Sequence, residues 1–332
     1  MKAFIINKYS KDEPLHLTDI PTPSIEENEV LIEIHSAGLN QLDSKIKSGE
    51  FKLILPYKMP LILGHDLAGI VLKTGSKVTR FKVGDEVYAR AADFHIGTFA
   101  EYIAVNENDL ALKPKNISME EAASIPLVGL TVWQAFEKAK LRKGQKIFIQ
   151  AGSGGVGTIS IQLAKYLGAI VATTTSTANI DWVKGLGADI VIDYKTQDFE
   201  YILKNYDLVL NSQDAKTLEK SLKTVKSKGK IISISGPPTP EFAKNIGASL
   251  PIRFILSLIS SSIRRKAKRK EIDYSFLFMR ADGHQLNQIT NLIESGVIKP
   301  VVDKIFPFEQ TNVALDYVEN GRAKGKVIVR VK

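Results

Sequence analysis

Residues 150–157 read Gln-Ala-Gly-Ser-Gly-Gly-Val-Gly and join an apolar run at 146–149 to a segment with helical periodicity. Gly152, Gly154 and Gly157 have the G-x-G-x-x-G spacing of a strand-to-helix corner that holds a dinucleotide pyrophosphate. Glycines there permit a tight turn, a close backbone approach to phosphate and close packing of helix on strand. The helix N-terminus adds unpaired N–H groups and the positive end of its dipole.

This corner predicts a cofactor site. A glycine turn without a ligand is the alternative, because the bare motif is common, but the flanking strand and helix favour a nucleotide. We expect the cofactor contacts at this corner to come from Gly152, Ser153, Gly154, Gly155, Val156 and Gly157.

Length and composition indicate a soluble protein of about two domains. The chain has 332 residues, of which 44% are hydrophobic and 24% are charged, which is ordinary for a globular protein. The first seven residues read as a strand and lack the long apolar core of a signal peptide. No apolar run approaches the roughly 20 residues of a membrane span. We therefore expect a cytoplasmic protein.

The chain contains no cysteine, which excludes disulfides, thiol nucleophiles, iron–sulfur clusters and cysteine-containing zinc sites. Its net charge is +9. The run from Arg264 to Lys270 supplies six of these positive charges and leaves three for the rest of the chain. The basicity is therefore local.

Residues from Met1 to about Asp109 have the pattern of an all-β region. Apolar and polar residues alternate over 30–35 and over 99–105, as in half-buried strands, and turn signals recur between such segments. This spacing predicts a small barrel or sandwich.

The pattern changes near Ser118, where Ser118 and Glu121 form a capping-box signature that opens a helix. Strands and helices then alternate, which argues for a parallel sheet with right-handed crossovers. A sixth strand over 274–278 and a helix near 283–295 follow, and residues 325–331 alternate like a strand that rejoins the first region. The other expected strands are 146–151, 169–175, 189–193, 206–211 and 229–235, with helices at 155–167 and 178–186.

The end of the second strand bears on the choice of dinucleotide. In an NAD-preferring site an acid ends that strand and binds the ribose 2′-hydroxyl. Here the strand ends in threonines, and the first acid, Asp181, lies inside the following helix. Hydroxyl and amide groups can donate hydrogen bonds to a 2′-phosphate, so we expect NADPH. The alternative is that this strand end is a polar surface that binds no ligand. The expected donors are Thr175, Ser176, Asn179 and Tyr194.

The chain resembles the medium-chain dehydrogenase/reductases, and within them the zinc-free quinone oxidoreductase and enone reductase branch. The resemblance implies an α/β protein with a GroES-like catalytic domain (1–122 and 280–332) and a Rossmann NADP-binding domain (123–279). Relatives are commonly homodimers. The matching segments are 37–40 with Asp43, 64–69, 81–88, 97–102, 129–131, 151–157, 186–189 and 321–327.

Related alcohol dehydrogenases hold a catalytic zinc with Cys, His and Cys or Glu. By the resemblance those positions fall at Asn40, His65 and Leu127, so one ligand of three survives, and a catalytic zinc normally has three protein ligands. We therefore expect no metal and interpret His65 as a packed turn histidine. A metal site at His65 and Asp66 is the alternative.

The resemblance also implies catalytic roles. Asn40 is expected to donate to the substrate carbonyl, and Thr131 to contact the nicotinamide. Lys45, two residues after Asp43, is a candidate cation or proton donor that points into the same cleft. A local cap or turn role for Asn40 and Thr131, and an exposed position for Lys45, are the alternatives.

Further cofactor contacts are expected from two loops. The backbone of Ser235 and Gly236, at the end of the fifth strand, should approach the nicotinamide. Gly325 and Lys326 should close over the cofactor from the returning tail.

Without a metal there is no Lewis acid to polarise an alcohol or carbonyl. Hydride transfer from a nicotinamide then suits acceptors that are already electrophilic, namely quinones or carbon–carbon double bonds conjugated to a carbonyl. We therefore expect an NADPH-dependent quinone oxidoreductase that also accepts activated enones. Enone reduction as the main activity, and a non-enzymatic nucleotide-bound sensor or RNA-binding protein, are the alternatives.

The basic run follows an apolar segment at 252–259. Such a pair of segments can contact an anionic membrane weakly, bind nucleic acid, or form a solvated helix end near a subunit interface. We favour the last interpretation, keep membrane contact through Arg264 to Lys270 as the alternative, and do not expect a nucleic-acid partner.

Overall fold

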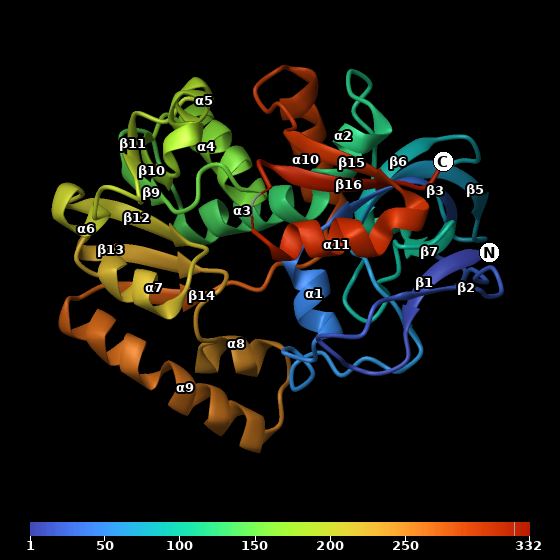
Figure 1. Ribbon diagram of the computed structural model, residues 1–332, viewed down its shortest axis with the longest axis horizontal. Coiled ribbons are helices and arrows are strands. Elements are labelled where there is room, and N and C mark those ends of the chain that lie inside the picture. Colours follow the sequence, from blue (N-terminus) through green and yellow to red (C-terminus); the bar gives the residue numbers. More distant parts are fainter. Residues whose placement is uncertain (322) are drawn as a thin grey trace. The chain divides into compact units, whose positions relative to one another are not determined.

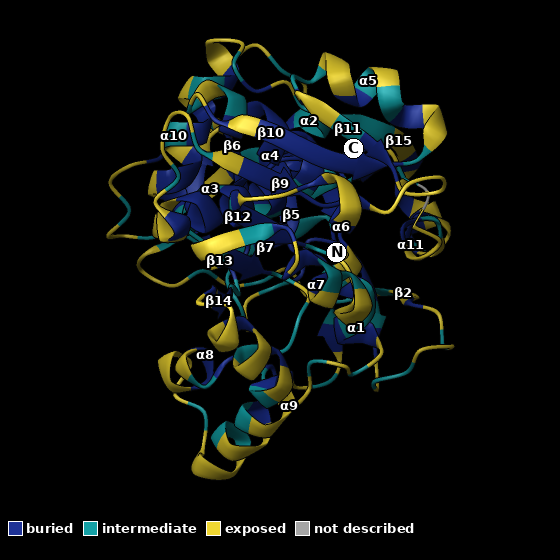
Figure 2. Ribbon diagram, turned by 90° about the vertical axis from the view of Figure 1, so that its left-hand side faces the viewer, coloured by how far each residue is buried: buried dark blue, intermediate teal, exposed yellow. Residues whose placement is uncertain are grey.

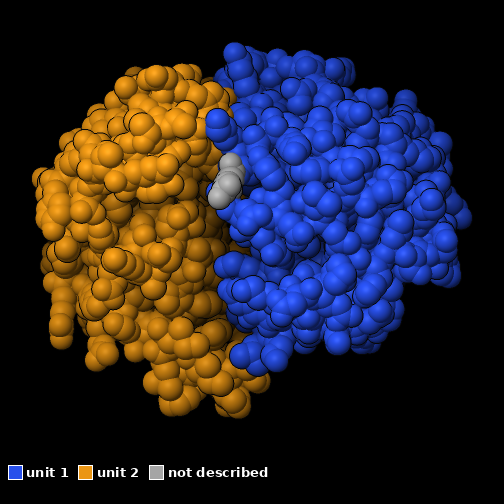
Figure 3. All heavy atoms as spheres, in the orientation of Figure 1, with its two compact units in different colours: residues 1–130, 280–332 blue, residues 131–279 orange. Residues whose placement is uncertain are grey.

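A computed structural model of the protein describes all residues except residue 322, so Arg322 of the last matching segment lies outside the described residues. The chain forms two compact units, residues 1–130 with 280–332 (unit 1) and residues 131–279 (unit 2), coloured separately in Figure 3. This division lies inside helix α3 (Pro126–Ala139), whereas the sequence places the domain boundary at 122/123. Among the described residues, no helix is long and apolar enough to cross a bilayer.

The described residues of unit 1 form two sheets. The larger has the order β15-β16-β3-β5-β6-β8, with β7 also paired to β3, and the smaller has the order β2-β1-β4. β16 pairs antiparallel with β3, with Val327 opposite Leu39, so the C-terminal strand rejoins the first region as the sequence predicts. The strands are β1 (Lys2–Ile6), β2 (His16–Asp19), β3 (Glu29–Leu39), β4 (Leu61–Ile62), β5 (Asp66–Thr74), β6 (Glu86–Arg90), β7 (Tyr102–Asn106), β8 (Leu110–Leu112), β15 (Val302–Pro307) and β16 (Lys326–Arg330).

The helices of unit 1 correct one expectation. Helix α1 (Gln41–Lys47) interrupts the region expected to be all-β, because the Asp43 carboxylate accepts the backbone N–H of Asn40 at 2.8 Å and supports the helix start. The expected capping box is confirmed, since Ser118 and Glu121 exchange hydrogen bonds of 3.2 and 2.9 Å. The remaining helices are α2 (Met119–Ala123), α10 (Gly283–Glu294), α11 (Thr311–Glu319) and the 3-10 turns at Glu107–Asp109 and Phe308–Gln310.

Unit 2 contains the parallel six-stranded sheet that the sequence predicts, with strand order β11-β10-β9-β12-β13-β14 (Figure 1). Numbered from β9, this is the 3-2-1-4-5-6 order of a Rossmann fold, and the order reverses between β9 and β12. Ligands of such folds bind beyond the carboxyl ends of the strands at this reversal. The strands are β9 (Lys146–Ile149), β10 (Ile170–Thr175), β11 (Ile190–Asp193), β12 (Tyr206–Asn211), β13 (Val225–Ser233) and β14 (Asp273–Phe276).

The helices that follow β9 and β10 agree with the sequence, and the segment between β13 and β14 adds two more. The helices of unit 2 are α3, which begins in unit 1, α4 (Gly155–Tyr166), the 3-10 turn Thr177–Asn179, α5 (Ile180–Gly185), α6 (Phe199–Ile202), α7 (Ala215–Ser221), α8 (Pro240–Asn245) and α9 (Leu250–Arg269). Phe148, Val209 and Ile231 on the central strands form one core cluster with Ile263 and Ala267 of α9.

Candidate active site

The three motif glycines differ in what the fold requires of them. A Cβ atom at Gly157 would lie 2.2 Å from the Ala151 oxygen, and one at Gly152 would lie 2.4 Å from Thr173 Oγ1. A Cβ atom at Gly154 would meet only the Ala151 oxygen, at an ordinary 3.4 Å. Packing of helix on strand therefore requires Gly152 and Gly157, whereas Gly154 leaves an open approach to the backbone.

The tight turn is made by a residue that the motif does not mark. Ala151 has φ 52°, in the left-handed region that costs a non-glycine residue roughly 1–2 kcal/mol. Its N–H donates to Thr174 Oγ1 at 3.2 Å, and its carbonyl accepts from Gly154 N at 3.0 Å. Gly152 N also donates to the Thr174 carbonyl at 2.8 Å. The neighbouring strand thus holds the corner in place.

Helix α4 begins directly after this turn. Its N-cap is Gly154, which has no side chain to accept from the first-turn N–H groups. Those groups and the positive dipole end suit an anionic ligand. Ser153, Gly155 and Val156 are only partly buried. The corner therefore fits a dinucleotide pyrophosphate.

An acidic residue of the neighbouring strand lies beside the end of the second strand, where the sequence pattern predicts none. The parallel register of β10 and β11 places Thr175 opposite Asp193. Asp193 Oδ2 accepts from Thr177 Oγ1 at 2.6 Å and Oδ1 accepts from Lys195 N at 3.0 Å. Donation from the Thr177 hydroxyl, then from the Lys195 N–H, lowers the Asp193 pKa. The third strand supplies this carboxylate, so only the strand pairing could have revealed it.

The four expected 2′-phosphate donors lie together at this edge. Tyr194 N donates to the Thr175 carbonyl at 3.1 Å, and Asn179 Nδ2 donates to Ser176 Oγ at 3.2 Å. The Tyr194 side chain is exposed (61%). Thr175 Oγ1 and Asn179 Oδ1 are buried and have no hydrogen-bond partner among the described residues. These two unsatisfied atoms fit a polar ligand.

A buried polar network, which the sequence gives no motif for, links the central strand ends. Gln150 Nε2 donates to Ser221 Oγ at 2.7 Å, and Gln150 Oε1 accepts from Asn211 Nδ2 at 2.7 Å. Ser233 Oγ donates to Asn211 Oδ1 at 2.5 Å and accepts from Gly236 N at 2.8 Å. The network therefore fixes the loop after β13, where nicotinamide contacts are expected.

Two further contacts hold the same loop. Ser235 Oγ donates to the Gln213 carbonyl at 2.7 Å, and Tyr274 Oη donates to the Pro237 carbonyl at 2.8 Å. Burial raises the pKa of Tyr274 to about 12. Contacts of Ser235 and Gly236 with the nicotinamide stay a prediction.

A buried polar cluster lies in unit 1. Lys326 Nζ donates to Asn40 Oδ1 at 2.5 Å, to Asp66 Oδ2 at 3.1 Å and to the Leu39 carbonyl at 2.8 Å. Asn40 Nδ2 donates to Asp66 Oδ2 at 3.0 Å, and Asp66 Oδ1 accepts from Leu127 N at 2.7 Å. All three side chains of this Asn40–Asp66–Lys326 cluster are buried.

The contacts of this cluster show that the Lys326 side chain points away from the direction expected from the sequence. Its side chain was expected over the cofactor, but it points to Asn40 and Asp66, because Lys326 begins β16, whose next residue pairs with Leu39. Gly325 has φ 84°, and a Cβ atom there would lie 2.3 Å from the Val301 oxygen, so the fold itself requires this glycine. Contacts of Gly325 and Lys326 with a cofactor stay a prediction.

His65 is a packed histidine, as the sequence predicts. Its Nδ1 lies 2.6 Å from Asp43 Oδ1, and both side chains are fully buried. His65 Nε2 has no hydrogen-bond partner among the described residues. Asp66 instead contacts Lys326. Within the described ranges 1–321 and 323–332, no three His, Asp or Glu side chains are grouped for a metal.

The structure separates Lys45 from Asp43. Two successive steps of an α-helix turn through about 200°, so the two residues lie on opposite sides of α1. Asp43 faces His65, whereas the partly exposed Lys45 pairs with Glu50 at 3.3 Å. The two side chains therefore do not point into one cleft, which corrects that hypothesis for Lys45. Thr131 is buried on α3, and its contact with the nicotinamide stays a prediction.

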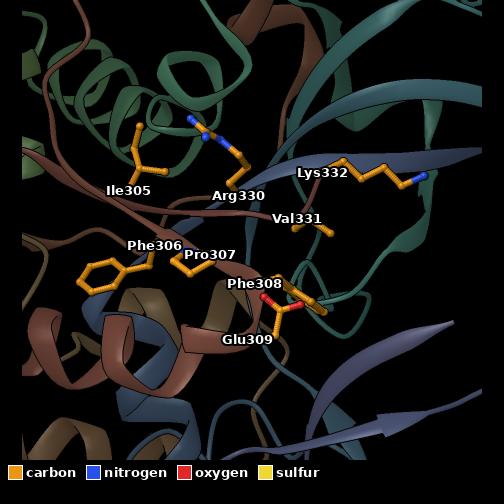
Figure 4. A pocket seen from close by; sticks show the side chains of 8 residues that line it. All are labelled: Ile305, Phe306, Pro307, Phe308, Glu309, Arg330, Val331 and Lys332. Carbon is orange, nitrogen blue, oxygen red and sulfur yellow. The ribbon is translucent and has the colours of Figure 1, made fainter.

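An open pocket in unit 1 is lined by two cations that already have acidic partners. It lies between the end of β15 and the C-terminal residues, and Figure 4 shows its lining from Ile305 to Glu309 and from Arg330 to Lys332. Its two cations are already paired, Arg330 with Glu120 and Lys332 with Glu33.

Comparisons with known proteins agree with both units. A family model described as an alcohol dehydrogenase GroES-like domain matches residues 26–115, and one described as a zinc-binding dehydrogenase matches residues 186–329. The chain is 36% identical to the 2-methylene-furan-3-one reductase of Solanum lycopersicum, over 99% of this chain and 79% of that protein. It is 35% identical to the chloroplastic NADPH-dependent alkenal/one oxidoreductase of Arabidopsis thaliana, with the same two coverages.

A solved structure has the same fold over the whole length of this chain. The quinone oxidoreductase from Coxiella burnetii superposes with a TM-score of 0.88 at 29% identity and covers 100% of this chain and 99% of that one.

Proposed function

We propose that this chain, which belongs to the zinc-independent quinone oxidoreductase and enone reductase branch of the medium-chain dehydrogenase/reductases, uses NADPH to reduce quinones or activated enones. Membership of this branch makes the protein an NAD(P)H oxidoreductase. The choice of NADPH and the class of acceptor are the proposal.

The proposed class of acceptor rests on the contacts of the Asn40–Asp66–Lys326 cluster. Asn40 Oδ1, the atom that would have to replace a zinc ligand, accepts from Lys326. Lys326 Nζ makes three hydrogen bonds, and Asn40 Nδ2 donates to Asp66 and, at 3.4 Å, to the Gly38 carbonyl. Because these donors are used within the cluster, the site suits an acceptor that is electrophilic without strong polarisation.

Each group of residues has its part in this reaction. When bound, the nicotinamide supplies the hydride. The corner from Gly152 to Gly157 binds the pyrophosphate at the start of α4, and the Gln150–Asn211–Ser233 network orients the loop after β13. We assign Asn40 to the substrate oxygen, which requires it to give up one contact within the cluster. We assign Lys45, which is partly exposed and pairs with Glu50, as the group that supplies a proton to the reduced acceptor.

NADPH is favoured by the donors at the end of β10. Ser176 and the exposed Tyr194 bring hydroxyl groups there, and Lys195 is an exposed cation beside them. Asp193 works against a 2′-phosphate through its charge, but both of its oxygens already accept hydrogen bonds from the protein. We therefore expect the donors to outweigh this single carboxylate.

Enone reduction as the main activity is the second candidate. The two relatives at 36% and 35% identity are named a furanone reductase and an alkenal/one oxidoreductase. Both names describe substrates with a double bond conjugated to a carbonyl.

Steady-state turnover with each cofactor and acceptor tests the proposal. Purified protein is assayed with NADPH and with NADH against 1,4-benzoquinone, 9,10-phenanthrenequinone and a short alkenone. We expect a higher kcat/KM with NADPH, and reduction of at least one quinone above background. Preference for the alkenone would favour the second candidate. A clear NADH preference would show that Asp193 dominates, and no turnover with any acceptor would contradict the proposal.

Two other expectations stay predictions. We expect a homodimer, which light scattering after size exclusion measures, and a cytoplasmic location, which fractionation of the source cells measures.

A further inference from the structure

Helix α9 is attached to unit 2 along one side only. Its buried residues are Leu256, Ser260, Ile263 and Ala267, whose three- and four-residue spacing defines a single stripe. Ile263 and Ala267 belong to the core cluster of unit 2, and α9 also packs on α8 and β14. The opposite side of this 20-residue helix is open to solvent, and Figure 2 shows exposed residues along much of its length.

The N-terminal half of this open side is apolar. Leu250, Phe254 and Leu258 are 77%, 65% and 57% exposed and follow one another at four-residue spacing. Ile255 and Ile259 flank them, 43% and 56% exposed. Contiguous exposed apolar side chains of this size mark an interaction surface.

The C-terminal half of the same side is cationic. Arg265 lies seven residues after Leu258, and Arg269 lies four residues further, so these two arginines project in nearly the same direction as Leu258. Lys268 lies beside the two arginines, and the three cations are exposed. Over the described part of the chain, no acidic side chain forms a salt bridge with Arg265, Lys268 or Arg269. In the same run, Lys266 pairs with Glu219 at 2.5 Å and Arg264 bonds to Ser257 and Ser260.

The two halves together discriminate between partners. A second copy of α9 packed antiparallel along its full length would place the cationic half on the apolar half, which is unfavourable. Nucleic acid would engage the cations and leave the apolar side chains exposed. A bilayer with anionic headgroups accepts both, because apolar side chains enter the headgroup boundary while neighbouring cations contact lipid phosphates.

We propose that the open side of α9 binds the surface of an anionic lipid bilayer and attaches this enzyme peripherally to a membrane. The membrane-facing residues are Leu250, Phe254, Leu258, Arg265, Lys268 and Arg269. Such a surface would hold the enzyme where apolar acceptors dissolve. The proposal concerns attachment and does not depend on which acceptor is reduced.

Co-sedimentation with lipid vesicles tests the proposal with the full-length protein. Vesicles of phosphatidylcholine alone are compared with vesicles that also contain phosphatidylserine, at low and high salt. We expect binding to the anionic vesicles at low salt, with loss at high salt, since each basic residue near an anionic surface contributes roughly 1 kcal/mol.

Three variants separate the contributions. Arg265→Glu/Lys268→Glu/Arg269→Glu reverses the charge of the three cations, and Phe254→Ser/Leu258→Ser removes apolar area without changing the charge. We expect each to weaken vesicle binding more than about tenfold. The matched control, Lys73→Glu/Lys82→Glu/Lys143→Glu, changes the net charge equally at exposed sites elsewhere and should retain binding. Turnover of a soluble quinone should be unchanged in all three.

Several results would overturn the proposal. The first is an absence of vesicle binding by the wild type at low salt. The second is an equal loss of vesicle binding in the Lys73/Lys82/Lys143 control, which would show only an effect of net charge. Unchanged vesicle binding by Phe254→Ser/Leu258→Ser, with cation-dependent binding to a DNA or RNA duplex, would identify a nucleic-acid surface. A wild-type dimer that becomes monomeric in Phe254→Ser/Leu258→Ser, without vesicle binding, would identify a subunit interface.

Discussion

The glycine corner of unit 2 and the polar cluster of unit 1 are built in opposite ways. The corner is one continuous segment, from Gln150 to Gly157, whose shape follows from its own residues and the strand beside it. The cluster joins Asn40 to Asp66 across 26 residues of sequence and Asp66 to Lys326 across 260. Local sequence therefore predicts the corner, and only the pairing of distant strands assembles the cluster.

The two regions also differ in how far function can be separated from folding. At the corner, Gly152 and Gly157 serve packing, and Gly154 leaves the ligand's approach open. In the cluster, each polar atom that could act on a substrate is also held by a buried partner. Substitution should therefore separate binding from stability at the corner and should fail to do so in the cluster.

Replacement of Lys326 by methionine should have the largest effect. It leaves the buried Asp66 carboxylate without its cation, which costs about 3–5 kcal/mol when one partner of a buried pair is removed. Urea unfolding measures the loss. Asp66→Asn/Lys326→Met should be less destabilised than the single variant, because no unpaired charge remains.

Lys113 provides the matched control. It is also buried, but its partner Glu86 is largely exposed and can be solvated by water. Lys113→Met should therefore cost clearly less than Lys326→Met. Equal losses would mean that the Asn40–Asp66–Lys326 cluster is no more demanding than an ordinary buried lysine.

The glycine pair Gly157→Ala and Gly154→Ala should divide stability from binding. Gly157→Ala forces a Cβ atom to within 2.2 Å of the Ala151 oxygen and should cost about 1–3 kcal/mol of folding free energy. Gly154→Ala has space in the fold and should keep the wild-type Tm, while the KM for NADPH rises on the order of tenfold, because the backbone no longer meets the phosphate closely. Equal NADPH affinity in Gly154→Ala and wild type would show that the corner does not hold the pyrophosphate.

Tyr274 should give unit 2 a pH dependence at alkaline pH. Burial raises its pKa to about 12, whereas an unfolded tyrosine titrates near 10. The stability that follows from this shift is fully present below about pH 10 and is lost as the pH rises through about 12.

Tyr274→Phe removes this titration together with the hydrogen bond to the Pro237 carbonyl. The variant should be about 1 kcal/mol less stable at pH 8, and the difference should shrink between pH 10 and 12. Burial also raises the pKa values of Tyr57 and Tyr88 in unit 1, so the measured quantity is the difference between wild type and variant. A difference that is constant with pH would contradict the assignment.

Asp193→Asn should have the smallest effect. Loss of one carboxylate at the end of β11 should lower the KM for NADPH by roughly two- to fivefold, within the 0.2–1 kcal/mol typical of a partly screened charge. The KM for NADH should change less, because it has no 2′-phosphate. An increase in the KM for NADPH would indicate that Asp193 orders Thr177 for binding.

Sequence patterns predicted most of unit 2. The strands from β9 to β14 and helix α4 lie within a few residues of the expected ranges, because periodicity and glycine turns are local properties. The sequence missed Asp193 at the cofactor edge and misplaced Lys45 relative to Asp43. The first error arose because the acid belongs to the neighbouring strand, and the second because α1 was not recognised as a helix.

The sequence by itself determined the class of protein and its class of cofactor. The glycine spacing and the alternation of strands and helices depend on residues that are neighbours along the chain, and the resemblance that identifies the family rests on short motifs that can be read along it. The tertiary structure alone decided that Ala151 makes the turn, that Lys326 contacts Asn40 and Asp66, and that the apolar and cationic halves of α9 share one open side. Those features depend on strand register and helix rotation, which arise only when distant segments pack together.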